Sequence, residues 1–350
     1  MIVSLDPEFT NFVLQQEKSF ETWCPESFKT LLGSDNLLTC AGSVHKYTRN
    51  LILRVFGPEN LRLQLLHEVD RIARTNLVSW VDRSSIDLKL SISSGRKSIM
   101  KALKQLLDEK QKNTERQERM DLLSLLIRDL EMEKHGLTEE YVLNVLFSIV
   151  FASFETTSTA LTVALKFLMD NPAALQELTE EHEQILKART NPDSGITWEE
   201  YKSMKFTSHV SCSYINCYIE GLRLANVTVV MFRKATGDVR VKAYTVPEGW
   251  TVMICPSANH LNPATYNDPQ VFNPRRWKDI SEPSGGSMNF LAFGRGPRYC
   301  AGAEFAKLQM AIFLHYLVTK YRWTLVRGGN MVLSPAPQFP NGFHVQVLPK

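Results

Sequence analysis

The sequence predicts a mainly α-helical fold with a small β-rich part, and three observations predict it. Apolar residues recur at spacings of three and four, with charged residues between them, over residues 61–80, 96–118 and 301–321. A longer helical pattern follows Thr138. The period-two alternation that is typical of strands occurs late, in VRVKAYTVPEGWTVMI, which is residues 239–254.

Composition limits the class of protein. The chain has 350 residues, of which 44% are hydrophobic and 22% charged, so it is of the soluble globular type and long enough for one or two domains. A net charge of +3 is too small to indicate nucleic-acid binding. The six cysteines form no C-x-x-C or C-x-x-C-H motif, which argues against a zinc cage or covalent haem attachment and favours a reducing compartment.

The first residues do not match a targeting segment. Asp6 and Glu8 interrupt the stretch where a signal peptide has an apolar run, and no basic residue precedes it. We therefore expect neither a signal peptide nor a membrane anchor in this sequence.

The longest predicted helix runs from Thr138 to about Asn171. Thr138 is a suitable N-cap, and Asn171-Pro172 ends the pattern, which leaves about 30 residues or about 45 Å of helix. Glu155 and neighbouring hydroxyls lie near its middle, so no uncharged apolar run is long enough to span a membrane. We expect Glu155 and Thr156 to be carried into the core, either satisfied structurally or handling protons and polar ligands.

The late alternating segment predicts a hairpin. Pro247 and Gly249 separate its two runs, and residues rich in Pro, Asn and Gly follow over 257–287. We expect the two runs to pair across the Pro247–Gly249 turn.

Glu220 and Arg223 stand three residues apart in IEGLRLAN and therefore share a helical face. Arg276 in FNPRRW could join them from a loop. A surface pair of this kind contributes about 0.2–0.5 kcal/mol, whereas breaking a buried one costs about 3–5 kcal/mol. Spacing alone leaves both possibilities open.

Cys300 ends a loop with unusual features, NFLAFGRGPRYCAG. Gly294 and Gly296 permit tight backbone turns, and the helix that follows aims its positive end at the sulfur, which we expect to lower the pKa of the thiol. Such a sulfur is suited to bind iron. A dinucleotide-binding loop is the weaker alternative because the third glycine is out of register, and a nucleophilic thiol lacks a well-placed histidine.

These residues resemble the cytochrome P-450 superfamily. FGRGPRYCAG is similar to the haem-binding motif F-x-x-G-x-R-x-C-x-G, and ASFETT, EGLR and FNPRRW follow the family's order of motifs. The sequence surrounding these motifs is similar to that of plant members that oxidise sterols, brassinosteroids and triterpenoids. The resemblance implies the P-450 fold, a helical haem-binding domain with a small β-rich subdomain, over residues 1–350.

The resemblance also implies residue roles. Cys300 is the expected metal ligand to haem b, with Phe293 beside the sulfur and Ala152 against the haem face. Glu155 and Thr156 are the expected catalytic residues that deliver protons. The haem propionates are expected to meet His45, Arg49, Arg233 and Arg298. Glu220, Arg223 and Arg276 are expected to form a buried structural triad.

The implied reaction inserts one oxygen atom of O2 into a C–H bond of a lipophilic substrate. An NADPH-dependent flavoprotein reductase supplies the electrons, at the cytosolic face of the endoplasmic reticulum. The domain is expected to be incomplete: the resemblance skips the family's N-terminal anchor and, around Leu90–Ser94, part of the distal lid. Ser153 replaces a usual glycine. The alternative is a haem-binding but inactive truncated member.

Overall fold

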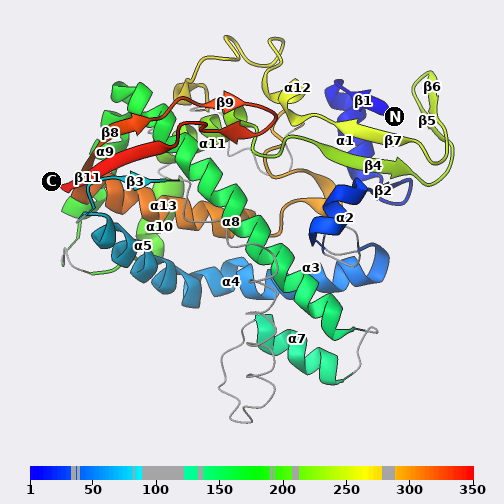
Figure 1. Cartoon of the computed structure of the whole chain (residues 1–350), viewed down its shortest axis with the longest axis horizontal. Helices are drawn as coiled ribbons and strands as arrows, with labels where there is room; N and C mark the ends of the chain where they lie inside the picture. The colour runs from blue at the N-terminus through cyan, green and yellow to red at the C-terminus, as the bar shows by residue number, and fades with distance from the viewer. Residues whose placement is uncertain are drawn as a thin grey trace.

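The two larger of the four sheets in the described residues lie at opposite ends of a body of helices in the computed structural model (Figure 1). The structure describes residues 1–32, 37, 40–81, 83–88, 122–132, 137–189, 191, 194–206, 213–277 and 288–350. The helices are α1 Pro7–Gln15, α2 Glu26–Leu32, α3 Gly42–Phe56, α4 Pro58–Asn60, α5 Leu66–Val81, α7 Leu122–Glu131, α8 Glu139–Asp170, α9 Pro172–Lys187, α10 Trp198–Phe206, α11 Ser213–Ala225, α12 Pro256–His260 and α13 Ala303–Lys320. Short helical turns are the π-helix η1 Leu61–Leu65 and the 3-10 helices η3 Pro274–Trp277 and η4 Gly296–Arg298. The strands are β1 Ile2–Ser4, β2 Phe20–Thr22, β3 Ile86–Asp87, β4 Met231–Ala235, β5 Val239–Val241, β6 Tyr244–Val246, β7 Thr251–Ile254, β8 Tyr321–Gly328, β9 Val332–Leu333, β10 Pro337–Gln338 and β11 Phe343–Pro349.

The sheet near the N-terminus joins distant parts of the chain. Its order is β1-β7-β4-β2, with β1 parallel to β7 and the other pairs antiparallel. The second sheet has the order β3-β11-β8 and is antiparallel. The mainly α prediction with a small β part is therefore confirmed.

The predicted hairpin over residues 239–254 is wrong in its turn. Pairing occurs between β5 and β6, across Lys242, which adopts a φ of 53°. Gly249 has a φ of 77°. The turn around it leads into β7, which lies between β4 and β1 in the sheet near the N-terminus. The sequence pattern located a real turn at Gly249, but β7 pairs with β1, a strand 250 residues earlier in the chain, which no local pattern indicates.

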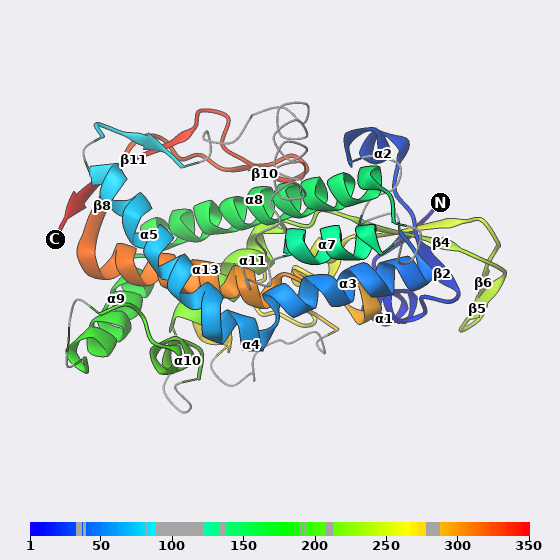
Figure 2. The ribbon, with the colours of Figure 1, turned by 90° about the horizontal axis from the view of Figure 1, so that it is seen from below.

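Helix α8 connects two hydrophobic clusters and runs across the middle of the molecule (Figure 2). Its N-terminal part packs with α3 and α7, through residues such as Val142 and Val145. Its C-terminal part packs with α9, α11 and α13, through residues such as Val163 and Leu168. Residues 149–158 between these parts are half-buried or exposed. The helix is thus fixed at both ends and accessible in its middle.

The predicted helix boundaries agree closely with the structure where it describes them. Thr138 caps α8 by accepting the Tyr141 N–H at 3.1 Å, and α8 ends at Asp170. The pattern over 61–80 forms η1 and α5, and that over 301–321 forms α13. The predicted helix over 96–118 and the proposed jump at Leu90–Ser94 lie outside the described residues.

Within the described part of the chain, α8 is the one helix with the length and composition of a membrane span. A central helix of a protein core passes the same test. Both ends of α8 are buried against other helices, which is the arrangement of a core helix.

Three fully buried histidines are expected to make stability fall in acid. His182 and His315 lie with their Nδ1 atoms 2.9 Å apart, and His260 is fully buried. Burial lowers the pKa of His182 and His260 to about 3 and that of His315 to about 2. Below about pH 6.5 the unfolded chain binds protons at these histidines that the folded chain does not bind. The free energy of unfolding is therefore highest above that pH, and it falls by about 1.4 kcal/mol per pH unit for each histidine toward pH 3.

Urea unfolding at pH 7.5 and 5.5 measures this loss. The variant His260→Gln is expected to lose about 1 kcal/mol less than the wild type between the two pH values. His67→Gln, on the exposed face of α5, is the control and should lose as much as the wild type. An equal loss in His260→Gln and the wild type would show that His260 is protonated in the folded chain.

Candidate active site

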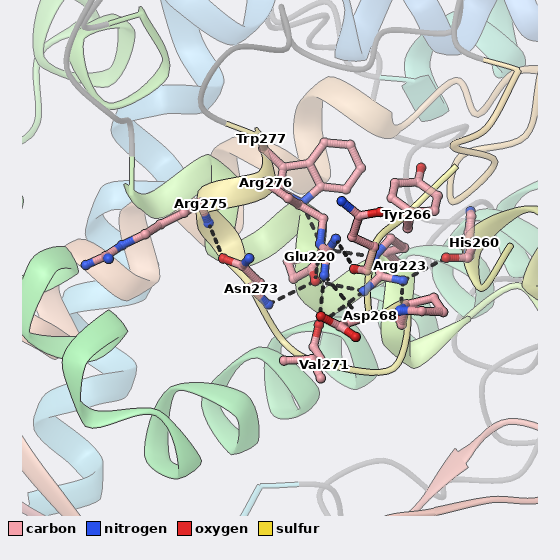
Figure 3. Close-up of polar contacts among 12 residues, drawn as sticks. Glu220, Arg223, His260, Tyr266, Asp268, Val271, Asn273, Arg275, Arg276 and Trp277 are labelled. Carbon is pink, nitrogen blue, oxygen red and sulfur yellow. Dashed lines mark hydrogen bonds and ion pairs between the residues drawn. The ribbon is translucent and has the colours of Figure 1, made fainter. Parts of the chain in front are cut away.

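Glu220 lies at the centre of a buried polar cluster (Figure 3). Its Oε1 accepts hydrogen bonds from Arg223 Nη2 at 2.8 Å, Arg276 Nε at 2.9 Å and the Asn273 backbone N–H at 3.0 Å. Its Oε2 accepts from Arg223 Nε and Trp277 Nε1, both at 2.9 Å. Glu220 and Arg223 are both 0% exposed, so the structure places this pair inside the protein rather than on its surface.

The two arginines of this cluster also hold a loop. Arg223 Nη1 donates to the carbonyls of His260 and Pro269, and Arg276 Nη1 donates to the carbonyl of Asn267. The Arg223 guanidinium lies 5.0 Å from the centre of the Tyr266 ring. The cluster therefore fastens residues 260–277 to helix α11.

Cys300 ends a loop whose backbone is closely fixed. Its N–H donates to the carbonyl of Phe293 at 2.9 Å, which closes the loop. Gly294 and Gly296 have φ values of 72° and 69°, a region that favours glycine. A Cβ atom on Gly296 would lie 2.4 Å from the carbonyl oxygen of Leu14, so only glycine lets the loop approach α1 this closely.

The Cys300 side chain is accessible to solvent, yet the protein around it desolvates the sulfur. This burial raises the pKa of the Cys300 thiol above its ordinary value, although a hydrogen bond from the Gly302 N–H and the charge of Arg49 both lower it. The sequence-based expectation of a lowered pKa is therefore wrong for the protein by itself, because desolvation exceeds the stabilisation that the loop provides. Phe293 packs 6.3 Å from Tyr299, centre to centre, beside the same loop.

Four basic residues from three parts of the fold influence one another near this loop. His45 and Arg49 come from α3, Arg233 from β4 and Arg298 from η4. Burial, with the positive charges of neighbouring arginines as a smaller contribution, lowers the pKa of His45 to about 4 and that of Arg233 to about 10. The positive charges thus stand close enough to repel one another.

One described carboxylate faces this cluster of His45, Arg49, Arg233 and Arg298. Glu17 Oε1 lies 2.6 Å from Arg298 Nε and 3.9 Å from His45 Nδ1. Arg298 Nη1 donates to the carbonyl of Cys40 at 3.0 Å, and Arg49 donates to the carbonyl of Tyr299, next to Cys300. The cluster is therefore tied to the cysteine loop on one side and retains excess positive charge.

The middle of α8 presents the other predicted residues. Ala152 and Thr156 are exposed and Glu155 is half-buried, so the expectation that these polar groups enter the core is wrong. The Thr156 hydroxyl donates to the Ala152 carbonyl at 2.6 Å, and the Ser153 hydroxyl donates to the Val150 carbonyl at 3.2 Å. Within the described ranges, no hydrogen bond or ion pair joins these α8 residues to Cys300 or to the four basic residues.

Sequence reasoning missed three residues that take part in these polar clusters. Glu17 gave no signal because it stands 281 residues from Arg298 in a turn after α1. Trp277 directly follows Arg276, and an indole next to a buried ion pair could have been considered as a donor. His260 is fully buried, and its Nε2 accepts the Leu291 N–H at 2.8 Å, a contact that needs the tertiary fold.

Comparisons with known proteins agree with one another. A family model described as Cytochrome P450 matches residues 57–345. The chain is 41% identical over 402 aligned positions to cytochrome P450 87A3 of Oryza sativa subsp. japonica, covering 100% of this chain and 77% of that protein. It is 37% identical over 402 positions to cucurbitadienol 11-hydroxylase of Siraitia grosvenorii, covering 100% of this chain and 83% of that protein. It is 33% identical over 408 positions to cholesterol 22-hydroxylase CYP90B27 of Paris polyphylla, covering 99% of this chain and 81% of that protein.

A solved structure has the same fold. Retinoic acid-bound cyanobacterial CYP120A1 superposes with a TM-score of 0.80, covering 98% of this chain and 88% of that one, at 21% sequence identity.

Proposed function

The chain belongs to the cytochrome P450 family and is a monooxygenase that uses haem iron, O2, a lipophilic substrate and a redox partner, and we propose that Cys300 would hold the haem iron through its thiolate. The observation that supports this most directly is the cysteine loop. Its backbone closes through the Phe293 carbonyl, and Cys300 is an exposed residue beside a cluster of excess positive charge.

The residues present fit a haem b group. Protoporphyrin IX carries two carboxylates, and the cluster of His45, Arg49, Arg233 and Arg298 offers three guanidinium groups and one imidazole, with Glu17 as the one described carboxylate that faces them. Guanidinium groups bind carboxylates with short, charge-assisted hydrogen bonds. We therefore assign these four residues to the propionates.

Cys300 would hold the iron from one side of the group. The Gly302 N–H and the Arg49 charge favour the thiolate, and a metal-bound thiol is deprotonated outright. When bound, haem supplies the iron centre at which O2 is activated, with the thiolate pushing electron density toward it. Phe293 would lie beside the sulfur on this side, where its ring packs against that of Tyr299.

The exposed middle of α8 would face the opposite side of the group. Ala152 leaves room for a flat ligand because it carries only a methyl group. Glu155 is half-buried and can exchange protons between solvent and the site, while Thr156 can pass a proton from its Oγ1. That hydroxyl now donates to the Ala152 carbonyl, so it must rotate before it can donate elsewhere.

The reaction we propose uses one O2, one NADPH and one proton. One oxygen atom enters a substrate C–H bond to give an alcohol, and the other leaves as water. We propose an NADPH-dependent flavoprotein reductase as the electron donor, the cytosolic face of the endoplasmic reticulum as the location, and a single catalytic domain over residues 1–350.

The proposed substrates are sterols, including brassinosteroids, or triterpenoids. The named relatives act on cucurbitadienol and cholesterol, and a third acts on β-amyrin. The side chains of Val150, Phe151 and Phe154 are exposed on α8, which suits a large apolar ring system.

Two measurements test this proposal. The purified protein, reduced and exposed to carbon monoxide, should develop the red-shifted absorption band of a thiolate-ligated haem. With a plant reductase, cucurbitadienol or cholesterol should then increase NADPH consumption and yield a hydroxylated product. The band without substrate-dependent turnover would favour the haem-binding but inactive alternative, and well-folded protein without haem would contradict both.

A further inference from the structure

The position of Glu17 is set by the cysteine loop itself. The turn at residues 16–19 follows α1, and η4 packs against α1. The missing side chain of Gly296 is what permits this approach, since a Cβ there would collide with the Leu14 carbonyl. The same close contact brings Glu17 within 2.6 Å of Arg298 Nε.

The Arg298 guanidinium is consequently held at two points. Glu17 accepts from Nε, and the Cys40 carbonyl accepts from Nη1 at 3.0 Å. Nη2 has no hydrogen-bond partner among the described residues. Two fixed points define the plane of a guanidinium, so the direction of its remaining N–H groups is determined by the protein.

The charges agree with a ligand that carries two carboxylates. Burial and the neighbouring arginines lower the pKa of His45 to about 4, which leaves this side chain neutral near pH 7. Arg49, Arg233 and Arg298 then contribute three positive charges, and Glu17 contributes one negative charge. Two positive charges remain, and protoporphyrin IX has two carboxylates to match them.

We propose that Glu17 is a positioning residue for haem binding, which orients the Arg298 guanidinium through Nε so that its free N–H groups meet a haem carboxylate. This inference rests on the proposed function, because it takes haem as the ligand. Groups that orient a ligand-binding residue commonly contribute about 10- to 100-fold to affinity in metal sites. Glu17 is half-buried, and among the described residues its ion-pair partners are Arg298 at 2.6 Å and His45 at 3.9 Å, so its polar contacts all belong to this cluster.

The test is the rate at which the purified haem-loaded protein transfers haem to excess apomyoglobin. Glu17→Ala is expected to lose haem about tenfold faster than the wild type. Glu17→Gln keeps an oxygen that can accept from Nε and should remain close to the wild-type rate. Glu8→Ala is the matched control, because it removes another carboxylate of the N-terminal region that pairs with Lys242 on the surface.

A double-mutant cycle decides whether Glu17 acts through Arg298. Arg298→Gln should itself accelerate haem loss, and adding Glu17→Ala to it should have no further effect. Urea unfolding of each variant shows whether faster haem loss comes instead from a general loss of stability. If it does, Glu17→Gln should lose stability as well.

Each other outcome contradicts the inference in a recognisable way. An unchanged rate in Glu17→Ala means that Glu17 does not position Arg298, and slower loss means that it competes with the haem carboxylate. Additive effects in the double variant mean that Glu17 acts independently. If the wild-type protein carries no haem, the proposed function fails and this inference fails with it, whereas the first three outcomes leave the proposed function intact.

Discussion

Replacing Cys300 by alanine is expected to abolish the red-shifted absorption band of the reduced carbon monoxide complex. The band depends on a thiolate bound to iron, and Cys300 is the sulfur that the described loop presents. The fold should persist, because the hydrogen bond between residues 300 and 293 uses backbone atoms that alanine retains. Far-ultraviolet circular dichroism should therefore match that of the wild type.

Cys255→Ala provides the control for this change. Cys255 is a free cysteine that precedes α12, so its loss should leave the band in place. A normal band in Cys300→Ala would show that another residue binds the iron, and the assignment of the site would be wrong.

Replacing Glu220 by alanine is expected to cost about 3–5 kcal/mol of unfolding free energy. The change leaves Arg223 buried without its carboxylate and removes the acceptor of Arg276 Nε and Trp277 Nε1. An unpaired buried guanidinium cannot recover its hydration, and this is the source of the large cost. Urea unfolding followed by circular dichroism measures it.

Two further variants make this test specific. Glu220→Gln keeps the hydrogen-bonding oxygen but removes the charge, so it should cost less than alanine and remain measurable if Glu220→Ala does not fold. Glu177→Ala removes a carboxylate that pairs with the exposed Arg275, and it should cost much less than Glu220→Ala because water screens an exposed ion pair. Equal effects of Glu220→Ala and Glu177→Ala would contradict the buried role.

The sequence predicted those parts of the site that depend on neighbours along the chain. The cap at Thr138, the ends of α8 and the helix after Cys300 all follow from local pattern, and the structure has them. The pairing of Glu220 with Arg223 also lies within one helical turn. What spacing left open was whether the pair is buried, because Trp277 and the His260 carbonyl come from other elements.

The predictions that failed are those decided by tertiary surroundings. The turn at Gly249 was located, but β7 pairs with β1, which lies at the other end of the chain. Glu155 was expected in the core because it lies at the middle of a long apolar helix, yet the packing clusters occupy only the two ends of that helix. The raised pKa of the Cys300 thiol reflects desolvation, which no local motif reports.

The anchoring of α8 at its two ends has a mechanical consequence. A bend between residues 149 and 158 would disturb few side-chain contacts, whereas a bend near Val142 or Val163 would open a packed cluster. Backbone amide exchange should accordingly be fastest at the centre of α8 and slow toward each end, a profile opposite to the fraying of an ordinary helix.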